Sequence, residues 1–163
     1  MQAVLIRHPK VLLAPGLCYG RLDAEIAPGS PLPATIAALP GRVWTSPARR
    51  CRGIAGPGAT ADARLLELDF GAWEGKFWDD VPRESLDRWA ADPLGFAPPG
   101  GESGAALLAR VAAFHAMLVQ RAEDCVVVSH GGPLKLLAAL LRGAVPDLLA
   151  PAPAIGSVTH IGG

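Results

Sequence analysis

Short apolar runs alternate along the chain with longer stretches whose apolar residues recur at helical spacing. The runs at 3–6 (AVLI) and 125–128 (CVVV) are continuous, which is typical of strands buried on both faces of a sheet. Shorter runs at 42–44 and 157–161 predict two more strands, and 64–68 is a further candidate. The pattern therefore predicts several short strands spread over the whole length.

Helix signals fill the intervals between these strands. Ser103 is suited to cap a helix that runs to about Ala122, because the apolar side chains that follow share one helical face. Ser46 and Pro47 suit the N-cap and first position of a helix that extends through Ala55. Further helices are predicted at 30–39, 82–91 and 133–141.

Strands that alternate with helices at short spacing favour parallel pairing, with helices on both faces of one sheet. We therefore predict a three-layer α/β sandwich around a mostly parallel central sheet. A chain of 163 residues suits a single domain over 1–163, and no internal repeat or long linker divides it. In sheets of this kind, ligands bind at the carboxyl ends of the strands.

Composition narrows the class of function. Fifteen basic residues balance fifteen acidic ones without a sustained cationic face, so nucleic-acid binding is not expected. No run reaches the roughly 20 apolar residues of a membrane span, and no signal peptide is visible, so we expect a cytoplasmic protein. The three cysteines are widely spaced, as free thiols in a reducing compartment would be. The four histidines lack metal-ligand spacing, so no metal or cofactor is expected.

Reactive side chains follow three of the predicted strands. Arg7 and His8 follow the first strand, Thr45-Ser46 and then Arg50 follow the second, and Ser129-His130-Gly131-Gly132 follows 125–128. Because the carboxyl ends of parallel strands share one edge of a sheet, we expect these side chains to meet there. His115 and His160 lie outside these junctions and are interpreted as structural.

This set of side chains matches the needs of phosphomonoester chemistry. Arginine binds phosphate oxygens with planar, permanently charged donors, and a helix that begins near Gly131 adds backbone N–H groups. A neutral imidazole can attack phosphorus, a second histidine can stabilise charge on the transferred group, and a carboxylic acid can protonate the leaving oxygen. The expected partner is therefore a small-molecule phosphomonoester.

Five motifs in order resemble the histidine phosphatase (phosphoglycerate mutase-like) superfamily over residues 3–161. They are Arg-His after the first strand, T-S-P-x-x-R at 45–50, L-x-E-x-D-F-G-x-W-E-G at 65–75, P-G-G-E-S at 99–103 and V-V-S-H-G-G at 127–132. The resemblance implies that His8 is the phosphorylated nucleophile and that Arg7 and Arg50, with His130 and Gly131, hold the phosphoryl group. It also implies that Glu67 is the general acid, with Asp69 and Glu74 as competing carboxylates.

One subgroup resembles the chain most. Residues 16–23 (GLCYGRLD) are similar to the G-x-C-Y-G-x-x-D stretch of α-ribazole phosphatases, which implies α-ribazole 5′-phosphate of cobalamin biosynthesis as the substrate. Candidate contacts to the leaving group are Tyr19, Arg21, Trp73 and Glu102.

The nucleophile motif departs from the family pattern. Where the family has Arg-His-Gly, this chain has Arg7-His8-Pro9, and proline has no backbone N–H to offer a phosphate. The alternatives are a compact phosphohistidine protein phosphatase, a broad-specificity phosphatase, a phosphoglycerate mutase or a non-catalytic phosphate-binding protein. The segment 69–75 argues against the compact branch, and the short stretch between Glu67 and Glu102 favours hydrolysis over mutase chemistry. The oligomeric state is left open.

Overall fold

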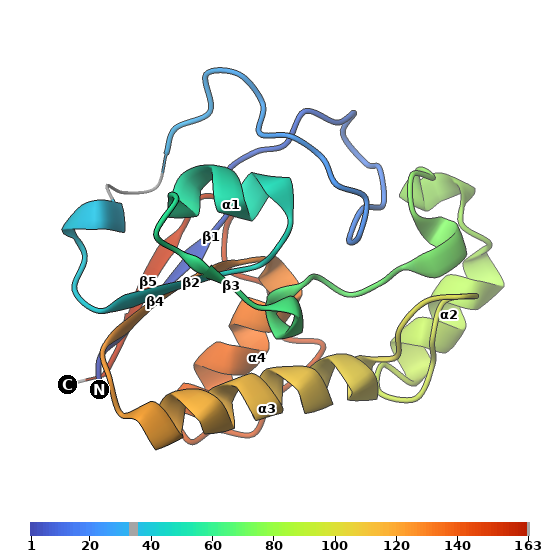
Figure 1. The fold of residues 1–163 in the computed structure, drawn as a ribbon. Helices are drawn as coiled ribbons and strands as arrows, with labels where there is room; N and C mark the ends of the chain where they lie inside the picture. Colours follow the sequence, from blue (N-terminus) through green and yellow to red (C-terminus); the bar gives the residue numbers. More distant parts are fainter. Residues whose placement is uncertain (33–35, 163) are drawn as a thin grey trace.

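Five strands form one sheet in the computed structural model of the chain, which describes residues 1–32 and 36–162 (Figure 1). The strand order is β3-β2-β4-β1-β5, and only β5 runs antiparallel to its neighbour. The mostly parallel sheet predicted from the sequence is therefore confirmed. The strands are β1 (Ala3–Arg7), β2 (Arg42–Thr45), β3 (Thr60–Ala61), β4 (Cys125–Ser129) and β5 (Val158–Ile161).

Helices cover both faces of this sheet, as the three-layer prediction required. Helix α1 (Arg49–Ala55) lies on one face, where it packs on Val126 and Val128 of β4. Helices α3 (Gly104–Arg121) and α4 (Gly131–Leu141) lie on the other face, against Val127. Because β4 is buried on both faces, it needs the uninterrupted apolar run seen in the sequence.

The segment between the sheet and α3 forms a small side layer. It contains α2 (Arg83–Ala91) and the 3₁₀ turns η3 (Gly71–Trp73) and η4 (Trp78–Asp80), drawn in green at the right of Figure 1. Its own core is a cluster of aromatic rings around Trp73 with buried Cys18 and Val81. Among the described residues, no helix has both the length and the apolar character that a bilayer crossing requires.

Two of the predicted elements differ in type in the structure. Residues 64–68 are not a strand, because the Asp62 side chain accepts a hydrogen bond from the Arg64 N–H and caps the 3₁₀ turn η2 (Ala63–Leu65). The edge strand is instead β3. Of the helix expected at 30–39, residues 30–32 are not helical, η1 (Ile36–Ala38) is a single 3₁₀ turn, and 33–35 lie outside the described residues.

Helix α1 begins at Arg49, two residues later than the Ser46-Pro47 signal predicted. Ala48 is the N-cap residue, and the Ser46 hydroxyl accepts only a weak hydrogen bond from the Ala48 N–H at 3.3 Å. The same hydroxyl lies 2.8 Å from Nε2 of His130, so a tertiary contact takes the place of the cap. Helix α4 begins at Gly131, directly after His130.

Strand register brings the three reactive junctions together at the carboxyl edge of the sheet. Arg7 on β1 is paired with Ser129 on β4, and the His8 N–H donates to the Ser129 carbonyl at 3.1 Å. On the other side of β4, the Ser46 N–H donates to the Val128 carbonyl at 2.9 Å. The backbone pairing therefore continues one residue past the strands and holds the three junctions side by side.

Candidate active site

His8 is a buried imidazole with a defined tautomer. Its Nδ1 lies 2.8 Å from the Pro9 carbonyl and donates to it, which leaves the lone pair on Nε2. Burial lowers the pKa of His8 to about 4, against the opposing hydrogen bond to Pro9, and the charges of Arg50 and Arg7 lower it further. At neutral pH the ring is therefore an uncharged imidazole. Pro9 supplies the orienting carbonyl, a function that does not need an N–H.

His130 packs edge-on against His8, with ring centroids 5.2 Å apart. Its Nε2 meets the Ser46 hydroxyl at 2.8 Å, and the Cys51 sulfur lies 3.6 Å from the same nitrogen. Burial lowers the pKa of His130 well below its usual range, and the positive charge of Arg50 lowers it further. Both histidines are therefore neutral at neutral pH.

Arg50 is fully buried and faces the loop that carries Tyr19. Its guanidinium donates to the Gly20 carbonyl at 2.6 Å and to the Leu22 carbonyl at 2.9 Å. The guanidinium carbon lies 5.3 Å from the centroid of the Tyr19 ring. Its Nε is buried and has no hydrogen-bond partner among the described residues. A donor of this kind suits an anionic ligand.

Glu74 holds the loop that faces Arg50. Its carboxylate accepts from the N–H groups of Gly20, Arg21, Leu22 and Phe70, at 2.9–3.2 Å. These bonds tie the Glu74 carboxylate to the backbone of residues 20–22 and 70. They orient the Gly20 and Leu22 carbonyls that receive the Arg50 guanidinium.

Two adjacent glycines at the start of α4 make room for two different side chains. A Cβ on Gly131 would lie 3.0 Å from the guanidinium carbon of Arg7, and a Cβ on Gly132 would lie 2.3 Å from Oε1 of Glu67. Arg7 donates to the Pro153 carbonyl at 2.5 Å, and its buried Nε has no partner among the described residues. The helix N-terminus, Arg7 and Glu67 can therefore approach one another only because both positions lack a side chain.

Glu67 is the carboxylate that reaches this helix N-terminus. Its Oε2 accepts from the Gly132 N–H at 3.2 Å, and its Oε1 accepts from the Leu68 N–H at 3.0 Å. The competing Asp69 accepts from the Gly71 N–H at 2.8 Å and stabilises a local turn. Of the three carboxylates, Glu67 is the one bonded to the helix that carries Gly131.

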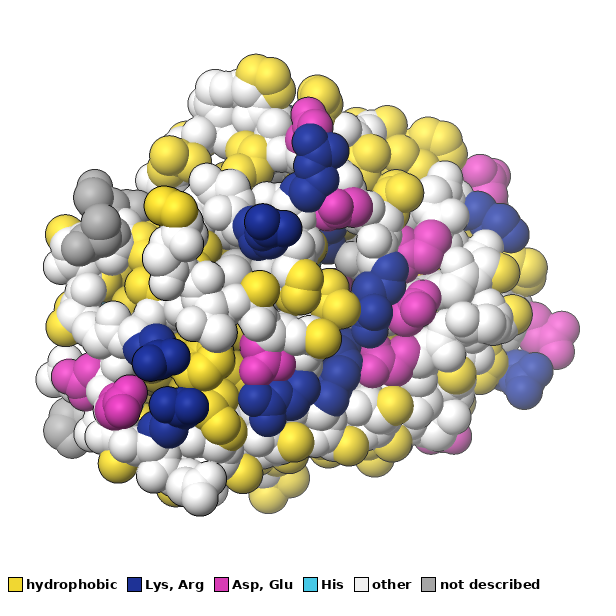
Figure 2. Space-filling view, viewed as in Figure 1, with side chains coloured by type: hydrophobic (Ala, Val, Ile, Leu, Met, Phe, Trp, Pro, Cys, Tyr) yellow, Lys and Arg dark blue, Asp and Glu magenta, His cyan; other side chains and the backbone are white. Residues whose placement is uncertain are grey.

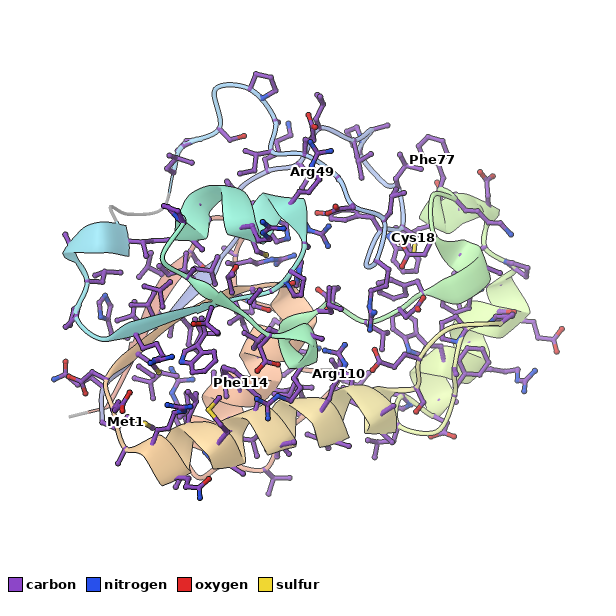
Figure 3. The ribbon with its side chains drawn as sticks, in the orientation of Figure 1. Met1, Cys18, Arg49, Phe77, Arg110 and Phe114 are labelled. Carbon is purple, nitrogen blue, oxygen red and sulfur yellow. The ribbon has the colours of Figure 1, made fainter. Side chains whose placement is uncertain are left out.

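Arg110 fastens the backbone beneath Glu67. It rises from α3 (labelled in Figure 3), and its five N–H donors meet five acceptors: the carbonyls of Arg64, Leu66 and Glu67 and both carboxylate oxygens of Glu102. Arg21 also donates to the Glu67 carbonyl, at 2.9 Å. Glu102 was expected to contact substrate. Its carboxylate instead accepts hydrogen bonds from Arg110, which also binds the Glu67 carbonyl.

Of the other residues expected to contact the leaving group, Tyr19 lies at the site and Trp73 does not. Tyr19 lies at the site, with its ring centroid 6.5 Å from that of His8. Trp73 does not: it is 2% exposed and packs among Trp78, Trp89 and Phe96, so it offers no free ring face to a substrate. That expectation was wrong because W-x-G spacing does not distinguish an aromatic core residue from a ligand contact.

Sequence reasoning missed several supporting residues. Ser46 and Cys51 contact His130, and Arg110 holds the Glu67 backbone. Of these, only Arg110 could have been noticed in the sequence, because it is an arginine next to the apolar face of α3. In the view of Figure 2, basic and acidic side chains are interleaved on the surface and no histidine is visible.

The assembled site combines complementary groups in a buried setting. Two guanidinium groups and one helix N-terminus can hold a phosphate, while two neutral imidazoles and one carboxyl group can exchange bonds and protons with it. The predicted catalytic and binding roles of these residues stay predictions.

Comparisons with known proteins agree with this geometry. The family model described as histidine phosphatase superfamily (branch 1) matches residues 4–161. A putative phosphoserine phosphatase 2 from Hydrogenobacter thermophilus is 30% identical over 145 residues, covering 78% of this chain and 71% of that protein.

Solved structures share the fold over almost the whole chain. A putative α-ribazole-5′-P phosphatase from Escherichia coli K-12 superimposes with a TM-score of 0.87 at 24% identity, covering 98% of this chain and 89% of that one. A phosphoglycerate mutase from Thermus thermophilus superimposes with a TM-score of 0.74 at 29% identity, covering 98% and 92%.

The burial of His8 predicts its titration. Because the pKa of His8 is lowered to about 4, its ring C–H resonances should shift with a midpoint near that value in an NMR pH titration. The resonances are identified by their absence in His8→Asn. A midpoint near 6.5 would contradict the buried, uncharged ring.

The lowered pKa of His8 also makes the free energy of unfolding depend on pH. The unfolded chain binds this proton more readily than the folded chain, so the contribution of His8 is complete above pH 6.5 and is lost as pH falls from 6.5 towards 4. The free energy of unfolding falls by roughly 3 kcal/mol over this pH range because of His8. Urea unfolding at both ends of that window should show a smaller acid loss for His8→Asn than for the wild type.

Proposed function

Because the chain belongs to the histidine phosphatase superfamily, branch 1, we propose that it is a phosphomonoesterase that works through a phosphohistidine at His8. One observation carries the proposal. The His8 ring is buried, donates through Nδ1 to Pro9 and keeps the Nε2 lone pair, at a sheet edge it shares with Arg50 and His130. This arrangement supports in-line attack on a bound phosphate.

In the first step, Nε2 of His8 attacks phosphorus and forms a P–N bond while the P–O bond to the leaving group breaks. The protonated carboxyl group of Glu67 gives its proton to the departing oxygen, so an alcohol leaves and a carboxylate remains. Arg7 and Arg50 bind the phosphoryl oxygens throughout.

In the second step, water attacks the phosphohistidine and the Glu67 carboxylate takes a proton from that water. The P–N bond breaks, inorganic phosphate leaves, and both His8 and Glu67 return to their starting forms. The chain supplies the required positive charge through Arg7 and Arg50, so the proposed reaction needs no metal ion.

We expect His130 to become protonated when the substrate binds. Its pKa is held low by burial and by neighbouring positive charge, and a dianionic phosphate beside the ring opposes that effect. The protonated ring then donates to an equatorial oxygen of the transferred group. Ser46 keeps the ring in position through its bond to Nε2.

The proposed substrate is α-ribazole 5′-phosphate. Its support is the stretch 16–23, in which Tyr19 lies under Arg50 and Asp23 accepts from the Arg49 N–H at 2.8 Å. The names of the relatives leave room for phosphoserine and for 3-phosphoglycerate as competing substrates. A protein that binds phosphate without hydrolysing it is disfavoured by the orientation of the His8 ring.

The nucleophile is tested by trapping the intermediate. Brief reaction with ³²P-labelled substrate should leave acid-labile phosphate on the wild type and none on His8→Ala, whose kcat/KM should fall about 10³-fold or more. His160→Ala, at an exposed position on β5, serves as the control and should retain activity. Wild-type activity should also persist in EDTA. Undiminished hydrolysis by His8→Ala would rule out the mechanism.

The general acid is tested by the choice of leaving group. Glu67→Gln should lower the rate for alkyl phosphates by about 10²- to 10⁴-fold, because the alkoxide then leaves without a proton. It should cost much less with p-nitrophenyl phosphate, whose leaving group needs no proton. Asp69→Asn removes a carboxylate of the neighbouring turn and should treat both substrates alike. A similar loss for both in Glu67→Gln would assign the proton to another group.

Substrate choice is tested by a panel. We expect the highest kcat/KM with α-ribazole 5′-phosphate, lower values with phosphoserine and 3-phosphoglycerate, and release of phosphate rather than the 2-phospho isomer from the last. A preference for phosphoserine would move the assignment to that class. Conversion of 3-phosphoglycerate to its isomer would make the protein a mutase.

A further inference from the structure

A buried thiol lies against His130, and the mechanism proposed above does not use it. The thiol belongs to Cys51 on α1, and its sulfur lies 3.6 Å from Nε2 and 3.9 Å from Nδ1 of His130. The Ser46 hydroxyl lies 2.8 Å from the same Nε2. All three side chains are 0% exposed, so a thiol, a hydroxyl and an imidazole form one cluster away from solvent.

The Cys51 thiol is uncharged at neutral pH. Burial raises its pKa to about 12, against the opposing positive charge of Arg50. The charges of Glu67 and Asp23 also raise this pKa, whereas a hydrogen bond with Ser46 lowers it. Cys51 is therefore not a reactive thiolate. What it offers is a neutral sulfur, which is a weak hydrogen-bond acceptor, beside the Ser46 hydroxyl.

Protonation of His130 changes which groups in the cluster can donate. A neutral imidazole has one N–H, whereas an imidazolium has an N–H on both nitrogens. Whichever nitrogen carries the hydrogen of the neutral ring, Nε2 of the protonated ring must donate to the Ser46 oxygen. The hydrogen of the Ser46 hydroxyl then needs another acceptor. The Ala48 N–H near this oxygen is itself a donor, which leaves the Cys51 sulfur as the acceptor.

We propose that Cys51 is a positioning residue for His130, whose sulfur accepts the Ser46 hydroxyl hydrogen when His130 is protonated and thereby stabilises the charged ring. The proposal rests on the phosphatase function above, in which His130 gains a proton as substrate binds. That proton comes from solvent and stays on the ring, while the Ser46 O–H bond only rotates and the Cys51 S–H bond stays intact. The second N–H of the ring, on Nδ1, is then left for a phosphoryl oxygen.

The charged groups that face His130 come from three elements, and each opposes its protonation. They are Arg50 on α1, Arg7 and His8 at the end of β1, and Arg110 on α3. A bound phosphate acts in the opposite direction. None of these groups is altered by a substitution at Cys51, so a shift in the protonation of His130 reports the missing acceptor.

The midpoint of His130 protonation is measured by NMR on ¹⁵N-histidine-labelled protein saturated with inorganic phosphate. Cys51→Val and Cys51→Ala should each lower the midpoint by about half a pH unit or more, because the buried Ser46 hydroxyl then lacks an acceptor in the charged state. Cys51→Ser keeps an acceptor and should have a midpoint close to that of the wild type. The His130 resonances are identified by their absence in His130→Asn.

Cys125 provides the matched control. It is also buried, it lies at the opposite end of β4 from the site, and Cys125→Val should leave the His130 midpoint unchanged. Equal midpoints in the wild type and in the Cys51 variants without an acceptor would overturn the proposal. The same shift in Cys51→Ser as in Cys51→Val would also overturn it, since the acceptor would then be irrelevant.

The path through the hydroxyl is tested by adding Cys51→Val to Ser46→Ala. If the sulfur acts on His130 through Ser46, the second substitution should cause no further shift of the midpoint. A shift of the same size in both backgrounds would mean that the sulfur acts directly on the ring, and would overturn the proposal.

The rate should show the same dependence on the acceptor. With p-nitrophenyl phosphate the leaving group needs no proton from Glu67, so we expect the alkaline limb of the kcat profile to report His130 in the substrate complex. Cys51→Val should move this limb to lower pH by about half a unit and approach the wild-type rate on the acid side, and Cys51→Ser should restore the limb. A loss of rate that is uniform over pH would indicate a distorted site and overturn the proposal.

The phosphate titration separates this inference from the phosphatase function, because it needs no turnover. If the wild type hydrolyses no phosphomonoester but the midpoints shift in the expected pattern, the phosphatase function fails and the assignment of Cys51 stands. If hydrolysis proceeds through His8 and the midpoints do not differ, the assignment of Cys51 fails alone.

Discussion

The rest of the site depends on the burial of positive charge at one edge of the sheet. His8, His130 and Arg50 are each at most 1% exposed, and Arg7 lies beside them. Several cations cannot share so little space and so little water, since each would raise the free energy of the others. The two histidines accordingly stay neutral, with the pKa of each held low, and the guanidinium charges are met by backbone carbonyls. The site thereby places two guanidinium groups beside two neutral imidazoles.

Two further charged side chains maintain this arrangement. Glu74 accepts four backbone N–H groups, three of them in the loop whose carbonyls receive Arg50. Arg110 uses all five of its donors to hold Glu102 and the backbone around Glu67. Each is partly withdrawn from solvent, and a hydrogen bond to an ionised group is stronger there than at the surface. The motifs around these residues thus specify the position of loops as much as the chemistry of the substrate.

Much of the fold could be predicted because its signals are local. The strand at 125–128 was predicted almost to its ends, since burial on both faces demands an unbroken apolar run. Helix α3 was predicted from Ser103, whose hydroxyl does accept from the Ala106 N–H at 3.2 Å. Prediction failed where a polar side chain had two possible partners. Ser46 carries a cap signal but bonds His130, and Glu102 carries a site signal but pairs with Arg110, because contacts across 84 and 8 residues override local preference.

The sequence by itself determined the alternation of strands and helices, and with it the meeting of the residues that follow β1, β2 and β4 at one edge. It did so because parallel strands align their carboxyl ends whatever the loops between them do. Only the tertiary structure decided which of three nearby carboxylates faces the helix N-terminus, that Trp73 belongs to a core, and that Cys51 lies against the His130 ring. Those outcomes depend on contacts between backbone N–H groups, carboxylates and aromatic rings from different parts of the fold. The spacing of residues along the chain does not predict such contacts.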